Sequence, residues 1–141
     1  MAQAIPYLAF DGNCAEAMRF YEAVLGLGAT LEAMMSGGDS PAAAHIPPEH
    51  ARRILHARLR FDDGSYIYAG DACVQVLYEG IKGVTLTMNY PSTAEAECVF
   101  AALSEGGKVI MPLGPMFWAK CAGMLVDRFG TSWSINGEVM I

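Results

Sequence analysis

The chain of 141 residues is long enough for one compact domain or for two small modules that share a core. Hydrophobic residues make up 53% of it and charged residues only 17%, which is more apolar surface than a small monomer easily buries, so we expect a homodimer. The net charge of −6, without any lysine or arginine cluster, argues against a nucleic-acid partner.

The first predicted elements are a strand, a helix and a second strand. Residues 5–10 form a short apolar run without charge, which is typical of a buried strand. Asn13 is placed to cap a helix, and Gly26 is placed to end that helix in the left-handed conformation. Residues 29–35 are predicted to form the next strand. Apolar side chains recur at helical spacing within the helix, at Cys14, Met18, Tyr21 and Leu25.

Residues 36–53 are predicted to form a long loop. They contain three prolines and two glycines and show no periodicity, and in a compact domain such a loop is usually a lid, an interface arm or a disordered segment. His45 and His50 lie in this loop. They have the donor chemistry for a metal ion, but histidines in a proline-rich loop are more often only solvated.

Residues 54–61 alternate in the manner of a strand with one apolar and one cationic face. A three-residue turn at 62–64 then leads into another strand at 66–70. The turn geometry places Arg58 opposite Tyr68. The apolar set of the first strand is Leu55, Ala57, Leu59 and Phe61, and its cationic set is His56, Arg58 and Arg60.

The second half of the chain repeats this plan. A strand predicted at 84–89 is followed by a helix that begins at a capping box formed by Ser92 and Glu95. Three further strands are predicted, at 108–113, 120–127 and 132–136. The result is a single α+β domain of two βαβββ modules, with module one at 1–72, a linker at 73–82 and module two at 83–141.

The turn between the last two predicted strands sets their register. It pairs Leu125 with Trp133 and Met124 with Ser134, so that Trp133 faces the helix and Ser134 faces the opposite side. The side away from the helix is polar enough in both modules to line a cavity for a small molecule. The candidate ligand-binding residues are His56, Arg58, Tyr68, Trp118, Lys120, Ser134 and Asn136.

Two interpretations of these residues remain open. Arginine and hydroxyl groups bind carboxylates and phosphates well, which favours an anionic ligand. Alternatively, Arg58 stacks on Tyr68 while His56 bonds to a backbone carbonyl, and no ligand is needed. Trp118 is equally suited to a packing or dimer contact. Cys121 is not expected to act as a nucleophile, because no base is evident beside it.

The cellular compartment is suggested by the cysteines and by the start of the chain. The four cysteines are widely spaced and form no CxxC pair, which indicates reduced thiols in the core. The chain does not begin with a basic segment followed by an apolar run, and no apolar run reaches the roughly 18 residues that span a bilayer. We therefore expect a cytoplasmic protein without membrane contact.

Three segments carry a family resemblance: PYLAFDGNCAEAMRFYEAVLG, ILHARLRFDDGSYIYAGD and FWAKCAGMLVDRFGTSWSIN. They resemble the vicinal oxygen chelate superfamily of glyoxalases, bleomycin resistance proteins and ring-cleaving dioxygenases, and in particular its PhnB-like branch. The resemblance implies that the two βαβββ modules form a cup-shaped, barrel-like sheet with the helices outside. It also implies a homodimer and a small molecule bound in the cup.

The resemblance further implies where a metal would bind. Metal-dependent members hold a divalent ion on the first and last strands of each module, and these places correspond here to Pro6, Tyr68, Val84 or Thr85, and Ser134. None of these residues is an ordinary ligand, so we expect neither a metal nor a cofactor.

The preferred function is therefore small-molecule binding without metal chemistry. One alternative is a drug-binding dimer of the bleomycin type, and another is a metal-dependent lyase or dioxygenase with a non-standard site. The methyltransferase activity sometimes associated with this branch would use S-adenosylmethionine. No glycine-rich strand-to-helix turn is present in the sequence to hold that cofactor.

Overall fold

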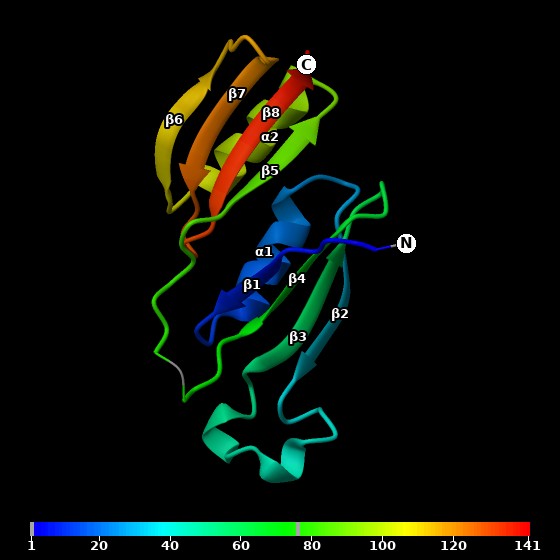
Figure 1. The fold of residues 1–141 in the computed structure, drawn as a ribbon, viewed down its shortest axis with the longest axis vertical. Coiled ribbons are helices and arrows are strands. Elements are labelled where there is room, and N and C mark those ends of the chain that lie inside the picture. The colour runs from blue at the N-terminus through cyan, green and yellow to red at the C-terminus, as the bar shows by residue number, and fades with distance from the viewer. Residues whose placement is uncertain (1, 76) are drawn as a thin grey trace. The chain divides into compact units, whose positions relative to one another are not determined.

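The computed structural model describes residues 2–75 and 77–141, and the chain divides into two compact units, Met1–Gly80 and Ile81–Ile141 (Figure 1). The boundary falls within the segment 73–82 that the sequence suggested as a linker. Each unit contains a four-stranded mixed sheet and one α-helix in the order strand, helix, three strands, which confirms the predicted α+β class. None of the helices in the described ranges is long and apolar enough to cross a membrane.

The first unit forms its sheet in the strand order β1-β4-β3-β2, with β1 parallel to β4 and the other neighbours antiparallel. Helix α1 packs on one face of this sheet, where Phe10, Met18 and Tyr21 are fully buried (Figure 1). The face away from α1 is called the open face of the first unit. The elements are β1 (Tyr7–Phe10), α1 (Cys14–Val24), β2 (Thr30–Ser36), β3 (Ile54–Arg60) and β4 (Tyr66–Asp71).

The start of α1 differs from the sequence prediction. Asn13 precedes the helix as expected, but its side chain makes no capping hydrogen bond. The acceptor is instead Asp71, at the end of β4, whose Oδ1 accepts hydrogen bonds from the backbone N–H of Gly12 at 2.8 Å and of Cys14 at 3.0 Å. A carboxylate at this end also complements the positive pole of the helix dipole. A residue more than fifty positions away thus replaces the local cap.

The register of β3 and β4 follows the prediction, with Arg58 opposite Tyr68. The predicted inward position of Leu55 is wrong, because Leu55 is 43% exposed while Ile54 is 5% exposed. The pairing of β3 with β2 explains why Ile54 is buried in place of Leu55. Met35 pairs with His56 but Ser36 pairs with Ile54, so Leu55 is the extra residue of a β-bulge and Ile54 takes the buried place.

Residues 36–53 form an ordered connection. Backbone hydrogen bonds from Gly37 N to Arg53 O at 2.9 Å and from Gly38 N to Ala51 O at 2.8 Å continue the β2–β3 pairing into it. Two short 3₁₀ turns, at Ala43–His45 and Pro48–His50, occupy the remainder. A loop of this length therefore has local structure of its own in the first unit.

The second unit has the strand order β5-β8-β7-β6, with β5 parallel to β8. Its helix begins as predicted, since the Ser92 hydroxyl accepts a hydrogen bond from Glu95 N at 3.2 Å. The predicted pairs Leu125 with Trp133 and Met124 with Ser134 are also confirmed. The elements are β5 (Thr85–Tyr90), α2 (Thr93–Ser104), β6 (Lys108–Gly114), β7 (Ala119–Val126) and β8 (Ser132–Val139).

Asp127 holds the β7–β8 turn in place. Its carboxylate accepts hydrogen bonds from the backbone N–H of Phe129 and Thr131, and from Trp133 Nε1 at 2.8 Å. Trp133 is fully buried, and its one polar atom therefore has a partner inside the core. Gly130 completes the turn with a φ of 92°, a conformation that favours glycine.

Candidate functional site

The open face of the first unit carries a cluster of four aromatic rings. We call this the aromatic cluster, and its members are Tyr7, His56, Tyr66 and Tyr68. His56 and Tyr68 meet edge to face with ring centroids 4.9 Å apart, and Tyr66 and Tyr68 are 5.7 Å apart. Tyr7 lies 5.8 Å from His56 and 6.5 Å from Tyr68. Rings in this arrangement offer apolar edges and faces to a planar ligand.

Tyr7 joins the aromatic cluster through β1, which is parallel to β4 and places Tyr7 beside Tyr68. Its hydroxyl donates a hydrogen bond to Leu55 O at 3.0 Å, the carbonyl of the bulged residue. Burial raises the pKa of Tyr7 above its ordinary value, so this hydroxyl is neutral at physiological pH. Tyr7 is not among the ligand-binding residues predicted from the sequence, although its alternation with the buried Leu8 in the first strand was a usable signal.

Two arginines and one glutamate lie on the same face. Glu32 is the extra residue of a second bulge, since Leu31 pairs with Leu59 while Ala33 pairs with Arg58. Glu32 Oε2 accepts a hydrogen bond from Tyr66 OH at 3.2 Å and lies 3.2 Å from Arg60 Nε. Its Oε1 lies 3.8 Å from Arg58 Nη2, at the outer limit of an ion pair. The carboxylate is therefore held mainly by Arg60 and Tyr66.

Arg58 is the least satisfied member of this group. Its Nε atom is buried and, within residues 2–75 and 77–141, has no hydrogen-bond partner. In the described part of the chain Arg58 makes an ion-pair contact with Glu32, and its stacking on Tyr68 stays a prediction. A guanidinium with an unused donor can still bind a carboxylate or a phosphate oxygen.

The face of the second sheet away from α2 is called the open face of the second unit, and its polar side chains Asn89, Ser134 and Asn136 are uncharged. Trp118 Nε1 donates a hydrogen bond to Asn136 Oδ1 at 3.1 Å, and Asn136 Nδ2 donates to Asn89 Oδ1 at 2.9 Å. Asn136 is 7% exposed and links the other two side chains. Ser134 lies on the same face of β8, two residues before Asn136.

Lys120 occupies a different environment from the other candidates. Its Nζ lies 2.9 Å from Glu138 Oε1, and Glu138 Oε2 accepts hydrogen bonds from Thr93 N and Thr93 Oγ1 at the start of α2. The hydrogen bond from Lys120, followed by those from Thr93, holds the pKa of Glu138 below its usual range. Lys120 thus supports a helix cap, and its contact with a ligand stays a prediction.

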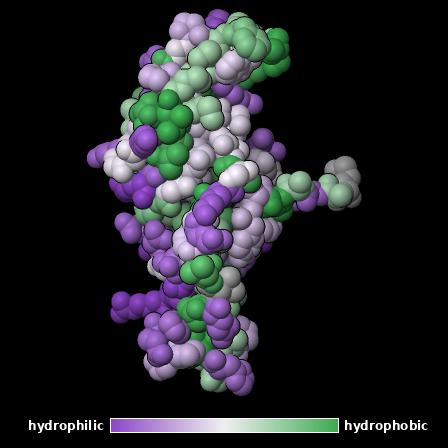
Figure 2. Space-filling model, turned by 60° about the vertical axis from the view of Figure 1, so that its left-hand side comes forward, coloured by the Kyte–Doolittle hydropathy of each residue, from purple (hydrophilic) through white to green (hydrophobic). Residues whose placement is uncertain are grey.

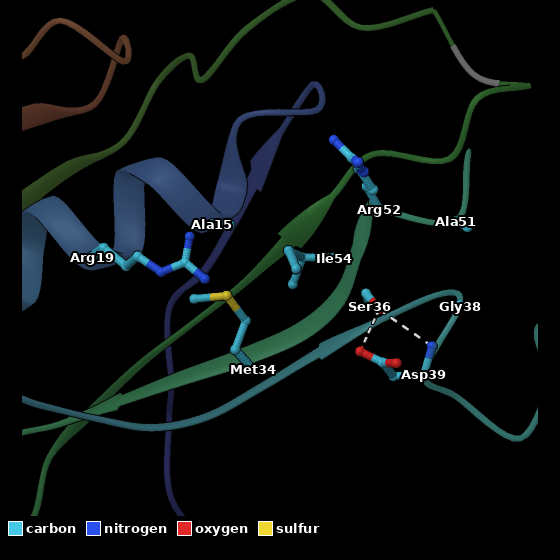
Figure 3. Close-up of a pocket in the computed structure, with 9 residues that line it drawn as sticks. All are labelled: Ala15, Arg19, Met34, Ser36, Gly38, Asp39, Ala51, Arg52 and Ile54. Carbon is cyan, nitrogen blue, oxygen red and sulfur yellow. Dashed lines mark hydrogen bonds between the residues drawn. The ribbon is translucent and has the colours of Figure 1, made fainter. Parts of the chain in front are cut away.

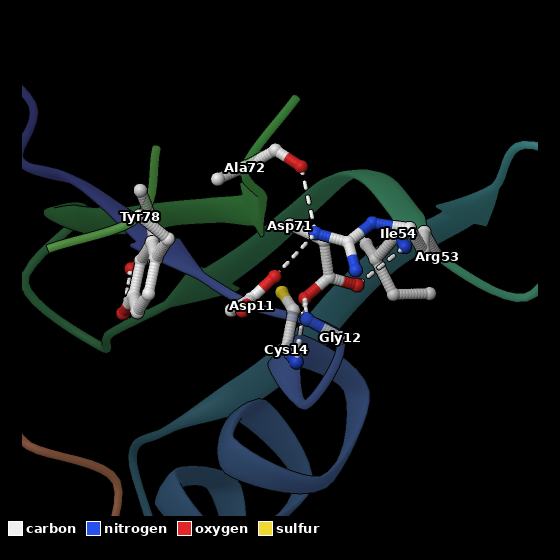
Figure 4. A network of polar contacts seen from close by, with 9 residues as sticks. Asp11, Gly12, Cys14, Arg53, Ile54, Asp71, Ala72 and Tyr78 are labelled. Carbon is white, nitrogen blue, oxygen red and sulfur yellow. Dashed lines mark hydrogen bonds and ion pairs between the residues drawn. The ribbon is translucent and has the colours of Figure 1, made fainter. Parts of the chain in front are cut away.

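A network of polar contacts surrounds Asp71 at the end of β4 (Figure 4). Asp71 Oδ2 accepts a hydrogen bond from Ile54 N at 2.7 Å, in addition to the bonds that its Oδ1 makes to the start of α1. Arg53 Nη2 donates to Asp11 Oδ1 at 3.0 Å and to Ala72 O at 2.7 Å. These contacts join β1, β3, β4 and α1, which indicates a structural network.

Cys14 lies within this network and is fully buried. Burial, followed by the nearby Asp71 charge, raises the pKa of Cys14 to about 12. The thiol is therefore protonated at physiological pH and has little nucleophilic character. All four cysteines are free thiols. Cys14 and Cys121 are buried, but Cys73 and Cys98 are exposed, so the prediction of core thiols is wrong for these two.

The residues at the metal positions of the resembled family do not fit a divalent ion. Pro6 has no side-chain donor, and Tyr68 and Ser134 have only hydroxyl groups. Across residues 2–75 and 77–141, no group of three or more histidine, cysteine, aspartate or glutamate side chains is arranged to hold a metal. His56 would be a lone imidazole among aromatic rings.

Comparison with known proteins identifies relatives over nearly the whole chain. A model of the Glyoxalase/Bleomycin resistance protein/Dioxygenase superfamily matches residues 4–135. Protein YjdN of Escherichia coli (strain K12) is 33% identical over 139 residues, which cover 93% of this chain and 92% of that protein.

Two solved structures extend this comparison. The crystal structure of protein PA1353 from Pseudomonas aeruginosa has 48% sequence identity and a TM-score of 0.88, with 98% of both chains covered. A putative 3-demethylubiquinone-9 3-methyltransferase, the PhnB protein from Bacillus cereus, has 24% identity and a TM-score of 0.79. The match covers 96% of this chain and 99% of that one, and it shows a shared fold.

Proposed function

The chain belongs to the glyoxalase/bleomycin resistance protein/dioxygenase superfamily, and we propose that it binds a small aromatic carboxylate on the open face of its first unit without a metal ion. The observation that carries this proposal is the buried Arg58 Nε, which has no hydrogen-bond partner in the described part of the chain. A buried donor of this kind costs free energy when it is left unpaired, and a ligand oxygen would relieve that cost.

The neighbours of Arg58 suggest the rest of the ligand. Arg58 is paired across the sheet with Tyr68, whose ring contacts His56, so a carboxylate at the guanidinium would place its body over the aromatic cluster. Planar aromatic ligands stack on such rings, and the neutral Tyr7 hydroxyl adds a polar group at the edge. The ligand-binding residues that the sequence predicts in the second unit stay predictions that this proposal does not use: Trp118, Lys120, Ser134 and Asn136.

The proposal gives no role to metal chemistry, because Pro6, Tyr68 and Ser134 lack the imidazole, carboxylate or thiolate donors that such an ion requires. A methyltransferase activity has no support either. Both described sheets are mixed βαβββ sheets, and neither is the doubly wound parallel sheet with a glycine-rich turn that commonly holds a nucleotide cofactor.

We also propose that the protein is a cytoplasmic homodimer. Figure 2 shows hydrophobic residues reaching the surface in several places. Val109 and Ile110, on the edge strand β6, are 42% and 54% exposed, so this strand presents both apolar side chains and unpaired backbone groups. Light scattering should return about twice the chain mass of 15.1 kDa, and a value near one chain mass at micromolar concentration would refute the dimer.

The ligand proposal is tested by titrating the protein with sodium benzoate while recording ¹H–¹⁵N and aromatic ¹H–¹³C NMR spectra. We expect saturable shifts of the Arg58 Nε–H and of the rings of His56 and Tyr68. Benzyl alcohol, which has the same ring without the charge, should bind at least about tenfold more weakly, because a charge-assisted hydrogen bond is lost. Equal binding of the two compounds, or shifts that avoid the open face, would contradict the proposal.

A further inference from the structure

We propose that the first unit contains a second ligand site on the opposite side of its sheet, which binds an amphipathic monocarboxylate such as a medium-chain fatty acid. The site is a cavity of about 620 Å³ between α1, β2 and the 36–53 connection (Figure 3). A volume of this size is in the usual range for small-molecule pockets. Its lining residues are Ala15, Arg19, Met34, Ser36, Gly38, Asp39, Ala51, Arg52 and Ile54.

The sheet separates this cavity from the aromatic cluster. Met34 pairs with Ala57, which is buried on the helix side, and the bulge at Leu55 brings Ile54 to that same side. The neighbouring residues Met35 and His56 pair with each other and face the other way. The two sites therefore use opposite faces of one sheet and share no lining residue.

The 36–53 connection forms one wall of the cavity, and this wall is in place without a ligand. Backbone hydrogen bonds join Gly37 to Arg53 and Gly38 to Ala51, and the two sides of the connection pack closely against each other. A Cβ atom on Gly38 would lie 3.2 Å from both the Cβ and the carbonyl oxygen of Ala51. The corresponding connection in the second unit, between β6 and β7, is only residues 115–118, so this wall exists in the first unit alone.

The charges in the cavity favour a single negative charge on the ligand. Figure 3 shows Arg19 reaching from α1 toward Met34, with Arg52 on the opposite rim. Neither arginine has a hydrogen bond or ion pair to any residue in the described ranges. Asp39 is the one carboxylate of the lining, and its Oδ2 accepts a hydrogen bond from the Ser36 hydroxyl at 3.0 Å. Two cations and one anion leave one unbalanced positive charge.

The apolar part of the lining identifies the remainder of the ligand. Ala15, Met34, Ala51 and Ile54 contribute hydrocarbon and no hydrogen-bonding side chain. An aliphatic tail removed from water by these side chains gains free energy in proportion to its buried area. A carboxylate head at one of the two arginines and an alkyl tail on Met34 and Ile54 therefore match the site in both charge and polarity.

The test uses sodium octanoate as the probe, with binding measured by calorimetry and by ¹H–¹⁵N NMR on the full chain. We expect saturable one-to-one binding, with shifts at Ala15, Gly38 and Ala51. The double variant R19Q/R52Q should bind about tenfold more weakly or worse, whereas R128Q, which removes an exposed arginine of the second unit, should bind as the wild type does. The neutral analogue 1-octanol should bind as weakly to the wild type as octanoate binds to the double variant.

Two further measurements keep this site distinct from the proposed carboxylate site on the open face. The R58Q variant should keep octanoate binding, and A51W, which fills the cavity, should lose octanoate binding while still binding benzoate. If the double variant is poorly folded by NMR, the single variants R19Q and R52Q, both at exposed positions, replace it. Loss of octanoate binding in R58Q with retention in R19Q/R52Q, or binding that never saturates, would overturn the second site.

Discussion

The Asp71 carboxylate, at the end of β4, accepts a hydrogen bond from the backbone N–H of Cys14, the first residue of α1, at 3.0 Å. The second unit has a counterpart, because Glu138 on β8 accepts a hydrogen bond from Thr93 N, at the first residue of α2. In each unit the last strand of the sheet thus caps the helix that follows its first strand. This cross-connection closes each βαβββ module around its own core.

Replacement of Asp71 by alanine should destabilise the protein by about 1–3 kcal/mol. The change removes the acceptor for the backbone N–H groups of Gly12, Cys14 and Ile54, and a lost helix cap or an unpaired buried donor has a cost of that order. Urea denaturation gives the free energy of unfolding. The matched control is D63A, which removes an aspartate that bonds only within an exposed turn, and a smaller loss for D71A than for D63A would contradict the role of Asp71.

Because of the bulge at Leu55, we expect truncation of Ile54 to destabilise the protein more than truncation of Leu55, whereas simple strand alternation predicts the reverse. I54A should cost about 2–4 kcal/mol of stability, because it empties a buried site. L55A removes a side chain that is 43% exposed and should cost less than about 1 kcal/mol. Thermal or urea unfolding of the two variants decides the matter, and a larger effect for L55A would show that the bulge is misplaced.

The Glu138 cap should make stability depend on pH in the acid range. The folded-state pKa of Glu138 is lowered, so its stabilising contribution is complete above the ordinary glutamate pKa of about 4.3 and is lost as the pH falls through the lower folded value. E138Q should therefore lower the melting temperature at pH 7 and have little effect near pH 3. The control is E97Q, on the exposed side of α2, which should show no such pH dependence. Equal effects of E138Q on the melting temperature at both pH values would rule out a link between Glu138 ionisation and stability.

Glu32 provides a test of whether the ligand on the open face of the first unit is an anion or a cation. It lies 3.8 Å from Arg58 Nη2 and competes with a ligand carboxylate for that guanidinium. E32Q should therefore bind benzoate a few-fold more tightly, in line with the modest strength of partly exposed ion pairs. A cationic probe such as benzylamine should gain nothing from the change. Weaker benzoate binding in E32Q would indicate that Glu32 orients Arg58 instead of competing for it.

The sequence predicted those parts of the fold that depend on local patterns. The hairpins around Gly64 and Gly130 followed from alternation and from the left-handed glycine in each turn, and their residue pairs are as expected. The capping box at Ser92 was likewise local. The cap at Asp71 was not predicted, because this acceptor comes from a strand that is distant in sequence. Asn13 immediately precedes the helix and is a favourable capping residue, so the sequence pointed to Asn13 instead.

The candidate site was only partly predictable for the same reason. His56, Arg58 and Tyr68 could be placed together because one hairpin register relates them. Glu32 was not foreseen, since a bulge of one residue in β2 decides which side of the sheet it reaches. The hydrogen bonds that link Trp118, Asn136 and Asn89 were not predicted. They depend on the pairing of β5 with β8, which lie at opposite ends of their module in sequence.

The most direct test of the proposed function compares R58Q with R60Q for benzoate binding, measured by calorimetry at one salt concentration. Both changes remove one positive charge from the same face, but Arg60 is already held by Glu32 at 3.2 Å while Arg58 has an unpaired buried Nε in the described structure. We predict that R58Q binds at least about tenfold more weakly than the wild type and that R60Q stays within about threefold of it. Wild-type affinity in R58Q, or equal losses in both variants, would contradict the assignment of Arg58 as the ligand-binding residue.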